Sequence, residues 1–240
     1  MLAPLSGALS PLPRRPAGSS LRRDLISYWK LDESSAGAGA VSRADSFGSN
    51  PLTDVNTTPS ASGKLNNAAS FDSANSEQLT ATSNASLQTG LIDFSISVWV
   101  NFASFATTNP IVGKLTGIAG TGAMEYSLSC PASGTIRFRT GNGTVFTTLD
   151  VSMTTSASTW YHLLAWVDAT AGTMNLKVNN GTTSSIAVSA IQTSGALFRI
   201  GGASNSLMNG LVDEVGFWKR VLTAAEITQL YNGGSGYAFL

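Results

Sequence analysis

The chain has 240 residues, and only 12% of them are charged, about half of the ~25% that is usual for soluble domains. Its 14 basic and 14 acidic residues balance, so the sequence has no excess of positive charge that would bind nucleic acid. Nucleic acid is therefore not expected as a partner. A single cysteine, Cys130, excludes an internal disulfide, and no apolar run approaches the ~18 residues that cross a bilayer. The composition predicts one long domain with a polar surface and no membrane insertion.

The first 23 residues differ in composition from the rest of the chain. Prolines interrupt the segment, and it shows neither a helical nor a strand period, which predicts an extended arm over residues 1–23. Four arginines of this arm precede the first acidic residue, and we expect them to contact an acidic surface of a neighbouring subunit; they are Arg14, Arg15, Arg22 and Arg23. The prolines and the late arginines do not fit a Sec-type signal peptide.

Strand patterns begin at residue 25 and recur about every 10–15 residues. Apolar and polar residues alternate over 94–101, which predicts a strand with one buried face. Two hairpins are expected, one turning at Asn142-Gly143 and one at Asn180-Gly181. Residues 160–167 are apolar on both faces, which is typical of a central strand.

The end of the chain predicts a strand that runs directly into a short helix. Leu211, Val215 and Phe217 alternate onto one face of the strand, and Asp213 is expected among them, so that an acid lies on an apolar face. The helix is predicted over residues 223–231, beginning with a capping box and ending at an Asn-Gly pair. Many short strands with one late helix indicate an all-β fold, a two-sheet antiparallel jelly-roll sandwich with one short C-terminal helix.

The order of these motifs resembles the laminin-G-like, concanavalin A-like lectin/glucanase superfamily. The resemblance rests on the acidic core of the last strand and the capped helix turn after it, and on further motifs in the same order; they are Tyr28–Glu33, Ala69–Asp72, Asp93–Val100, Trp160–His162 and Phe198–Gly201. It implies a jelly-roll domain over 24–234 and leaves 235–240 as a C-terminal tail. The superfamily includes lectins, carbohydrate-binding modules, adhesion domains and virion proteins, so the resemblance implies a fold and not a single function.

Catalysis has little support in the sequence. The one histidine, His162, lies within an apolar strand, and no nucleophile-elbow motif is present. Glucanases of the superfamily use two carboxylates on one strand face, separated by one or three residues. The pairs Asp32-Glu33 and Asp213-Glu214 are adjacent instead, so in a strand their side chains point to opposite faces. We therefore predict that the protein is not an enzyme.

A carbohydrate site requires aromatic rings beside fixed polar groups. Most of the five tryptophans lie in strand interiors, so the core is the default expectation for each of them, and Trp99 and Trp218 are the first candidates to face outward instead. The predicted glycan-binding set on a sheet face consists of Trp99, Tyr126, Arg137, Arg139 and Asn142. The other interpretation of the arginines is that they are simply solvated strand positions.

One cofactor is left open by the sequence, a structural calcium ion. Asp213 on an apolar face is the best candidate ligand, because a buried carboxylate is costly unless a metal or hydrogen-bond donors neutralise it. Asp32 and Asp72 are weaker candidates. The alternative is that Asp213 accepts hydrogen bonds from backbone amides of the turn that follows it.

Together these patterns predict a non-catalytic structural or adhesion protein of a phage particle, such as a capsid decoration, head-fibre or tail-associated protein on the virion surface. The arm would anchor it to other virion subunits, a homo-oligomer is expected, and cell-surface glycans are a further candidate partner. Tyr237 and Phe239 in the tail are expected to contact a neighbouring subunit, or else to cover the edge of the sandwich itself. The alternative function is a stand-alone extracellular carbohydrate-binding module or adhesin.

Overall fold

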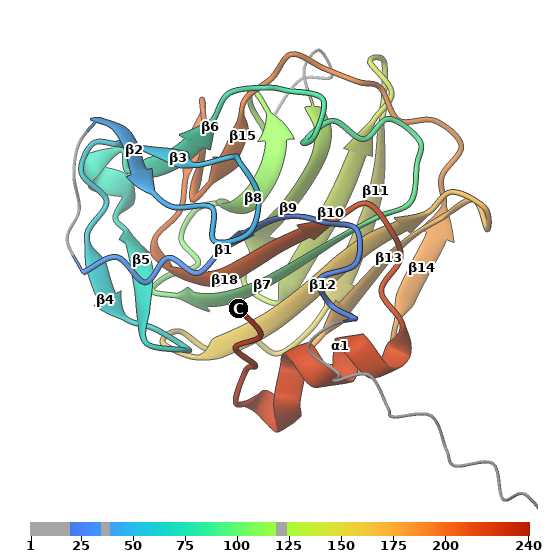
Figure 1. Cartoon of the computed structure of the whole chain (residues 1–240). Helices are drawn as coiled ribbons and strands as arrows, with labels where there is room; N and C mark the ends of the chain where they lie inside the picture. The colour runs from blue at the N-terminus through green and yellow to red at the C-terminus, as the bar shows by residue number, and fades with distance from the viewer. Residues whose placement is uncertain (1–19, 35–38, 119–123) are drawn as a thin grey trace, which may run out of the picture.

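Two antiparallel sheets packed face to face make up the computed structural model, which describes residues 20–34, 39–118 and 124–240 (Figure 1). Every strand pairing in these ranges is antiparallel, and one short α-helix lies against the outside of the first sheet. The predicted fold class, a two-sheet sandwich with one short C-terminal helix, is confirmed. No helix in the described ranges is long and apolar enough to cross a membrane.

The first sheet, sheet A, carries the helix on its outer face. Its strands follow the order β14-β13-β12-β7-β18-β5-β4, and β1 pairs with β18. Their bounds are β14 (Ser184–Ala187), β13 (Thr173–Val178), β12 (Trp160–Asp168), β7 (Phe94–Phe102), β18 (Gly210–Trp218), β5 (Asn67–Phe71), β4 (Ser60–Ser62) and β1 (Leu25–Trp29). Strands from both ends of the chain thus meet at β18.

The second sheet, sheet B, has the order β11-β10-β9-β8-β15-β6-β3-β2. Its strands are β11 (Phe146–Ser152), β10 (Thr135–Gly141), β9 (Met124–Ala132), β8 (Asn109–Leu115), β15 (Phe198–Ile200), β6 (Gln78–Ala81), β3 (Leu52–Val55) and β2 (Gly39–Arg43). The smaller elements are the hairpin of β16 (Gly202–Ala203) and β17 (Ser206–Leu207), the 3-10 helices η2 (Ser73–Asn75) and η3 (Asn232–Gly234), and α1 (Ala224–Tyr231). Both predicted hairpins form, between β10 and β11 and between β13 and β14.

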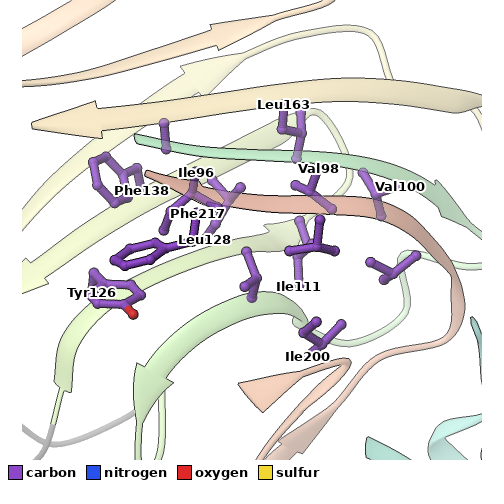
Figure 2. Packing of buried hydrophobic residues seen from close by; sticks show 14 of the residues in the cluster. Ile96, Val98, Val100, Ile111, Tyr126, Leu128, Phe138, Leu163, Ile200 and Phe217 are labelled. Carbon is purple, nitrogen blue, oxygen red and sulfur yellow. The ribbon is translucent and has the colours of Figure 1, made fainter. Parts of the chain in front are cut away.

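The core fills the space between the two sheets (Figure 2). Ile96, Val98 and Val100 of β7 are at most 1% exposed and point into it, as their alternation predicts. Trp29 of β1 stacks on Phe198 of β15 at a ring-centroid distance of 4.7 Å. This contact joins the two sheets across the core.

A bulge in β18 reverses the predicted alternation of that strand. Asp213 pairs with Trp99 on β7, but the next pair is Gly216 with Ser97, so β18 holds one residue more than β7 in this interval. Glu214 takes up the extra residue with a left-handed φ of 51°. Val215 points into the core, whereas Asp213 lies on the outer face of sheet A. The prediction that Asp213 shares a face with Val215 and Phe217 is therefore wrong.

The capping box predicts the start of α1 correctly. The hydroxyl of Thr223 accepts from the amide of Glu226, and the carboxylate of Glu226 accepts from the amide of Thr223. Asn232 ends the helix in the left-handed conformation with a φ of 47°. The buried face of the helix contributes Ile227 and Leu230 to a second apolar cluster, on the outer face of sheet A.

Trp218 belongs to this second cluster and is not exposed. Its side chain is 0% exposed, and its indole N–H donates to the carbonyl oxygen of Leu21 at 2.7 Å. Leu21 is itself fully buried, in a turn over residues 20–24 that packs on β18. Trp218 is thus buried, as the default expectation for the tryptophans had it. Residues 20–23, which the sequence assigns to the arm, cover this side of sheet A.

Candidate functional site

Two of the predicted glycan-binding residues are buried. Tyr126 is 0% exposed, lies in the core, and donates its hydroxyl to the carbonyl oxygen of Leu87 at 2.9 Å. Trp99 is 3% exposed on the outer face of sheet A, where the ring of Tyr231 from α1 stacks on it at 5.9 Å and the ammonium of Lys64 lies 4.8 Å from its ring. Neither ring is open to a sugar, so this part of the prediction is wrong.

The other three predicted glycan-binding residues lie on sheet B. Arg137 forms a two-point ion pair with Asp150 of β11, each N···O distance being 2.6 Å. Arg139 donates to the carbonyl oxygen of Ile118 at 3.2 Å, and Asn142 accepts from two amides of its own turn. These groups already have partners within the fold. The predicted set thus divides between two sheets and does not form one site.

The three candidate calcium ligands do not form one cluster, although the charge of Asp32 lies close enough to Asp213 to help raise its pKa. One oxygen of Asp213 accepts from the amides of Lys64 and Leu65, at 2.8 and 2.9 Å. Asp32 accepts from the amide of Asn67 at 3.2 Å, and Asp72 caps η2. Within the described ranges no group of three or more His, Cys, Asp or Glu side chains could hold a metal ion. Each of the three carboxylates accepts a backbone hydrogen bond within the fold, and the structural calcium ion stays a prediction.

The candidate assembly contacts have different surroundings. Arg22 and Arg23 are exposed beside the buried Leu21, and Arg14 and Arg15 lie outside the described residues. Phe239 is 8% exposed and packs edge-on against Tyr28 at 4.5 Å. The tail therefore covers its own sheet, the second of the two outcomes considered for it.

An open cleft of about 440 Å³ lies at one end of the sandwich, where β5 and β7 end and β18 begins. We call it the end cleft; it is lined by Ser70, Phe71, Asp72, Asn101, Ala103, Ser158, Asn209, Gly210 and Leu211. Gly210 allows the strands to come this close, because a Cβ atom there would lie 2.1 Å from the carbonyl oxygen of Asn101. The volume is typical of a site for a small molecule.

Several polar side chains of the end cleft have no partner in the fold. The side chains of Ser70, Asn101, Ser158 and Asn209 make no hydrogen bond to any residue that the structure describes. They are half-buried or exposed, so water satisfies them in the free protein. An amide side chain both donates and accepts, as a hydroxyl group does. The end cleft thus offers matched partners for a ligand rich in hydroxyl groups.

Trp160 provides an aromatic surface next to this cleft. It pairs with Asn101 across β12 and β7, so the two side chains share the outer face of sheet A as direct neighbours. Leu211 and Ser70 continue the same row across β18 and β5. Trp160 is half-buried, whereas Trp29, Trp99 and Trp218 are at most 3% exposed. A half-buried aromatic ring beside amide and hydroxyl groups is the kind of arrangement that sugar binding requires.

Asn109, which is 1% exposed, holds the walls of the cleft in place. Its amide nitrogen donates to the carbonyl oxygens of Ser104 and Thr107, at 3.0 and 3.2 Å, and its oxygen accepts from the amide of Asn209 at 2.9 Å. The β7–β8 loop and the start of β18 are therefore fixed to each other through one buried side chain.

The end cleft has no groups arranged for acid–base or nucleophilic chemistry. Asp72 is its one carboxylate, and its other side chains are amides, hydroxyls and apolar groups. His162 lies outside the cleft, hydrogen-bonded to Ser97 at 2.8 Å, and burial lowers its pKa to about 3. The arrangement can hold a ligand through hydrogen bonds and ring contact.

Asn101, Asn209 and Trp160 were not predicted to be site residues. Asn101 is a polar residue at the end of an alternating strand, and Asn209 precedes a glycine, so each has an ordinary local explanation. Only the pairing of β7 with β12 and β18 brings them together. For these residues, the one pattern in the sequence that could have predicted a binding site is the alternating strand that ends in the amide of Asn101.

The sandwich and its cleft define a lectin-like domain. The chain belongs to the concanavalin A-like lectin/glucanases superfamily, because a laminin G family model with that description matches residues 71–228, more than half of the chain. No curated protein matches the sequence.

Solved structures of low sequence identity share the fold. The binding domain of Paraclostridial Mosquitocidal Protein 1 superimposes with a TM-score of 0.68 at 16% identity, over 89% of this chain and 53% of that one. Domain 4 of AbnA, a GH43 extracellular arabinanase from Geobacillus stearothermophilus in complex with arabinotriose, gives a TM-score of 0.66 at 18% identity, over 85% and 97%.

A structure of botulinum neurotoxin type C gives a TM-score of 0.63 at 13% identity, over 91% of this chain and 53% of that one. Cell entry of that toxin depends on interaction with two ganglioside molecules. The chain thus spans about half the length of the two toxin chains and nearly all of the arabinanase domain.

Proposed function

We propose that the protein is a non-catalytic carbohydrate-binding domain and that the end cleft, with Trp160 beside it, is its sugar site. The observation that carries this proposal is the set of unpaired amide and hydroxyl side chains in a cleft of about 440 Å³, next to the half-buried indole ring of Trp160. The similar folds support it, since one was solved with arabinotriose and another depends on gangliosides for cell entry.

Alanine substitution of three residues tests the sugar site. A glycan array first identifies a ligand, and calorimetry then compares the wild type with N101A, N209A and W160A. Loss of a hydrogen bond or of a stacking ring should weaken binding about tenfold or more. The matched control is R137A/R139A, which removes the polar groups of the other sheet face. If the control loses affinity and the cleft variants do not, the sugar site is on sheet B instead.

We further propose that this domain is part of a phage particle, as a capsid decoration, head-fibre or tail-associated protein. The Pro- and Arg-rich composition of residues 1–23 and the exposed Arg22 and Arg23 support an arm that contacts other virion subunits. Light scattering of the full chain and of a chain beginning at Ser20 tests this. We expect oligomers or particle binding for the full chain only. If the full chain and the shortened chain are both monomers of equal stability, the result favours the alternative, a stand-alone extracellular carbohydrate-binding module or adhesin.

A further inference from the structure

A second cleft lies beside the end cleft. It has a volume of about 290 Å³ and is lined by Ser73, Thr107, Ser204, Asn205, Ser206 and Leu207, and we call it the hairpin cleft because four of these residues belong to the β16–β17 hairpin and its turn. The side chains of Ser73, Thr107 and Ser204 make no hydrogen bond to any described residue. This cleft therefore has the same kind of unpaired hydroxyl groups as the end cleft.

The two clefts are neighbours along three separate segments of the chain. Asp72 lines the end cleft and the next residue, Ser73, lines the hairpin cleft. In the β7–β8 loop, Ala103 lines the end cleft and Thr107 lines the hairpin cleft. On the two sides of the buried Met208, Asn209 lines the end cleft and Leu207 lines the hairpin cleft. The clefts thus open side by side at one end of the sandwich.

One buried side chain fixes both clefts together. Asn109 donates to the carbonyl oxygen of Thr107, in the hairpin cleft, and accepts from the amide of Asn209, in the end cleft. The hydroxyl of Ser206 donates to the carbonyl oxygen of Thr108 at 2.7 Å, which holds the β16–β17 hairpin on the same loop. The relative position of the two clefts is therefore set before any ligand arrives.

The charge of the lining limits the ligand. Neither lining contains a lysine, arginine or histidine, and Asp72 is the one charged residue in the two. An anionic sugar would meet a like charge and no cation, whereas an uncharged sugar meets amide and hydroxyl groups that match its own.

We propose that the end cleft and the hairpin cleft form one continuous site for an uncharged oligosaccharide, whose chain crosses the Leu207–Asn209 segment and occupies both clefts at once. This inference rests on the proposed function of the end cleft and adds to it the class and the length of the ligand. Trp160 and the end cleft bind one end of the chain, and the hydroxyl groups of Ser73, Thr107 and Ser204 bind its continuation.

The test is a length series of neutral oligosaccharides, with about one to five sugar units of arabinose, xylose, glucose or mannose, measured by calorimetry on the full chain. Affinity should increase with length until both clefts are filled. The triple variant S73A/T107A/S204A should bind the shortest ligands as the wild type does and the longest ones about tenfold more weakly. These three side chains have no partner in the fold, so the variant should keep its melting temperature. Sialyllactose, an acidic probe, should bind more weakly than a neutral chain of equal length.

The outcomes separate this inference from the function on which it rests. If no glycan binds, or N101A and N209A bind as the wild type does, the proposed function fails. If short ligands bind in the end cleft but affinity does not rise with length, or the triple variant binds long ligands normally, the sugar site stands and the continuous site is overturned. Tighter binding of the acidic probe would overturn the neutral class.

Discussion

At the scale of single residues, the bulge in β18 places two acids side by side in a covered layer. Asp213 and Glu214 are 0% and 5% exposed, and Glu214 accepts a hydrogen bond from the hydroxyl of Tyr28. Burial raises the pKa of Glu214 to about 8. Burial also raises the pKa of Asp213 to about 7, against the lowering effect of the amides of Leu65 and Lys64. Both carboxyl groups thus favour their protonated forms in the folded chain.

Stability should therefore fall as the pH rises. The folded chain keeps on Glu214 a proton that the unfolded chain releases near the ordinary carboxyl pKa, so the free energy of unfolding should drop by roughly 3–5 kcal/mol between about pH 5 and pH 9. In E214Q the amide can still hydrogen-bond to Tyr28, and the part of the drop that Glu214 contributes should disappear, while the part that Asp213 contributes remains. Denaturant unfolding at a series of pH values measures it.

The neighbouring acid provides the control for this experiment. D213N should remove the part of the drop that lies between about pH 4 and pH 7, the unfolded and folded pKa values of Asp213, while keeping an oxygen that accepts from Lys64 and Leu65. If E214Q and the wild type lose stability in parallel, the titration belongs to another group.

At the scale of elements, the outer face of sheet A is a second core. Helix α1, the turn over residues 20–24 and the tail all pack on it, and Arg220 joins them. Arg220 pairs with the capping-box residue Glu226 at 2.7 Å, and it donates to the carbonyl oxygens of Arg23 and Ser20. The short helix is therefore held by tertiary contacts more than by its own length.

The tail should contribute measurably to stability. Phe239 lies 4.5 Å from the ring of Tyr28 and 6.3 Å from that of Trp218, so F239A should lower the free energy of unfolding by about 2–4 kcal/mol. The matched control is F47A, because Phe47 is 41% exposed and its loss should change stability by less than about 0.5 kcal/mol. Denaturant unfolding of both variants measures the difference. An F239A variant as stable as the wild type would show that the tail is free to bind a neighbour.

The elements also show where sequence reasoning succeeds. The capping box of α1 and the turn at Asn142 depend on residues three or four positions apart, so their chemistry is legible locally. The bulge at Glu214 cannot be predicted from such local patterns. One extra residue with a positive φ shifts every later side chain of the strand to the other face. Asp213 was therefore assigned to the wrong face. The cover over Trp218 was not predicted in detail, because it comes from segments that are distant in the sequence.

At the scale of the whole molecule, strand pairs join the two ends of the chain. β1 pairs with β18, and the ammonium of Lys30 donates to the carbonyl oxygen of Leu240 at 2.7 Å. The candidate site has the same dependence on topology, since Ser70, Asn101, Ser158 and Asn209 approach one another only when β5, β7, β12 and β18 are assembled. Periodicity predicts the strands but not their order, and so it did not predict the cleft.

Removal of β1 should therefore unfold the domain. A chain beginning at Ser20 keeps Leu21, Tyr28 and Trp29, and it should melt cooperatively. A chain beginning at Lys30 loses these three side chains, each at most 2% exposed, together with one edge of β18, and should lack a cooperative transition. Circular dichroism with heating distinguishes the two. A cooperative melt of the shorter chain at an unchanged temperature would mean that β1 is only an accessory strand.

The position of the N-terminal turn relative to β18 governs how the domain faces a partner. The turn over residues 20–24 lies at the Trp218 end of this strand, and the end cleft lies at the Gly210 end, about 25–30 Å away along nine residues. A support joined to the N-terminal side thus leaves the cleft pointing outward. Many copies fixed in this way on one surface would all present their clefts in parallel, and if the clefts bind sugar as proposed, the combined avidity should exceed the affinity of one cleft by about 100-fold or more.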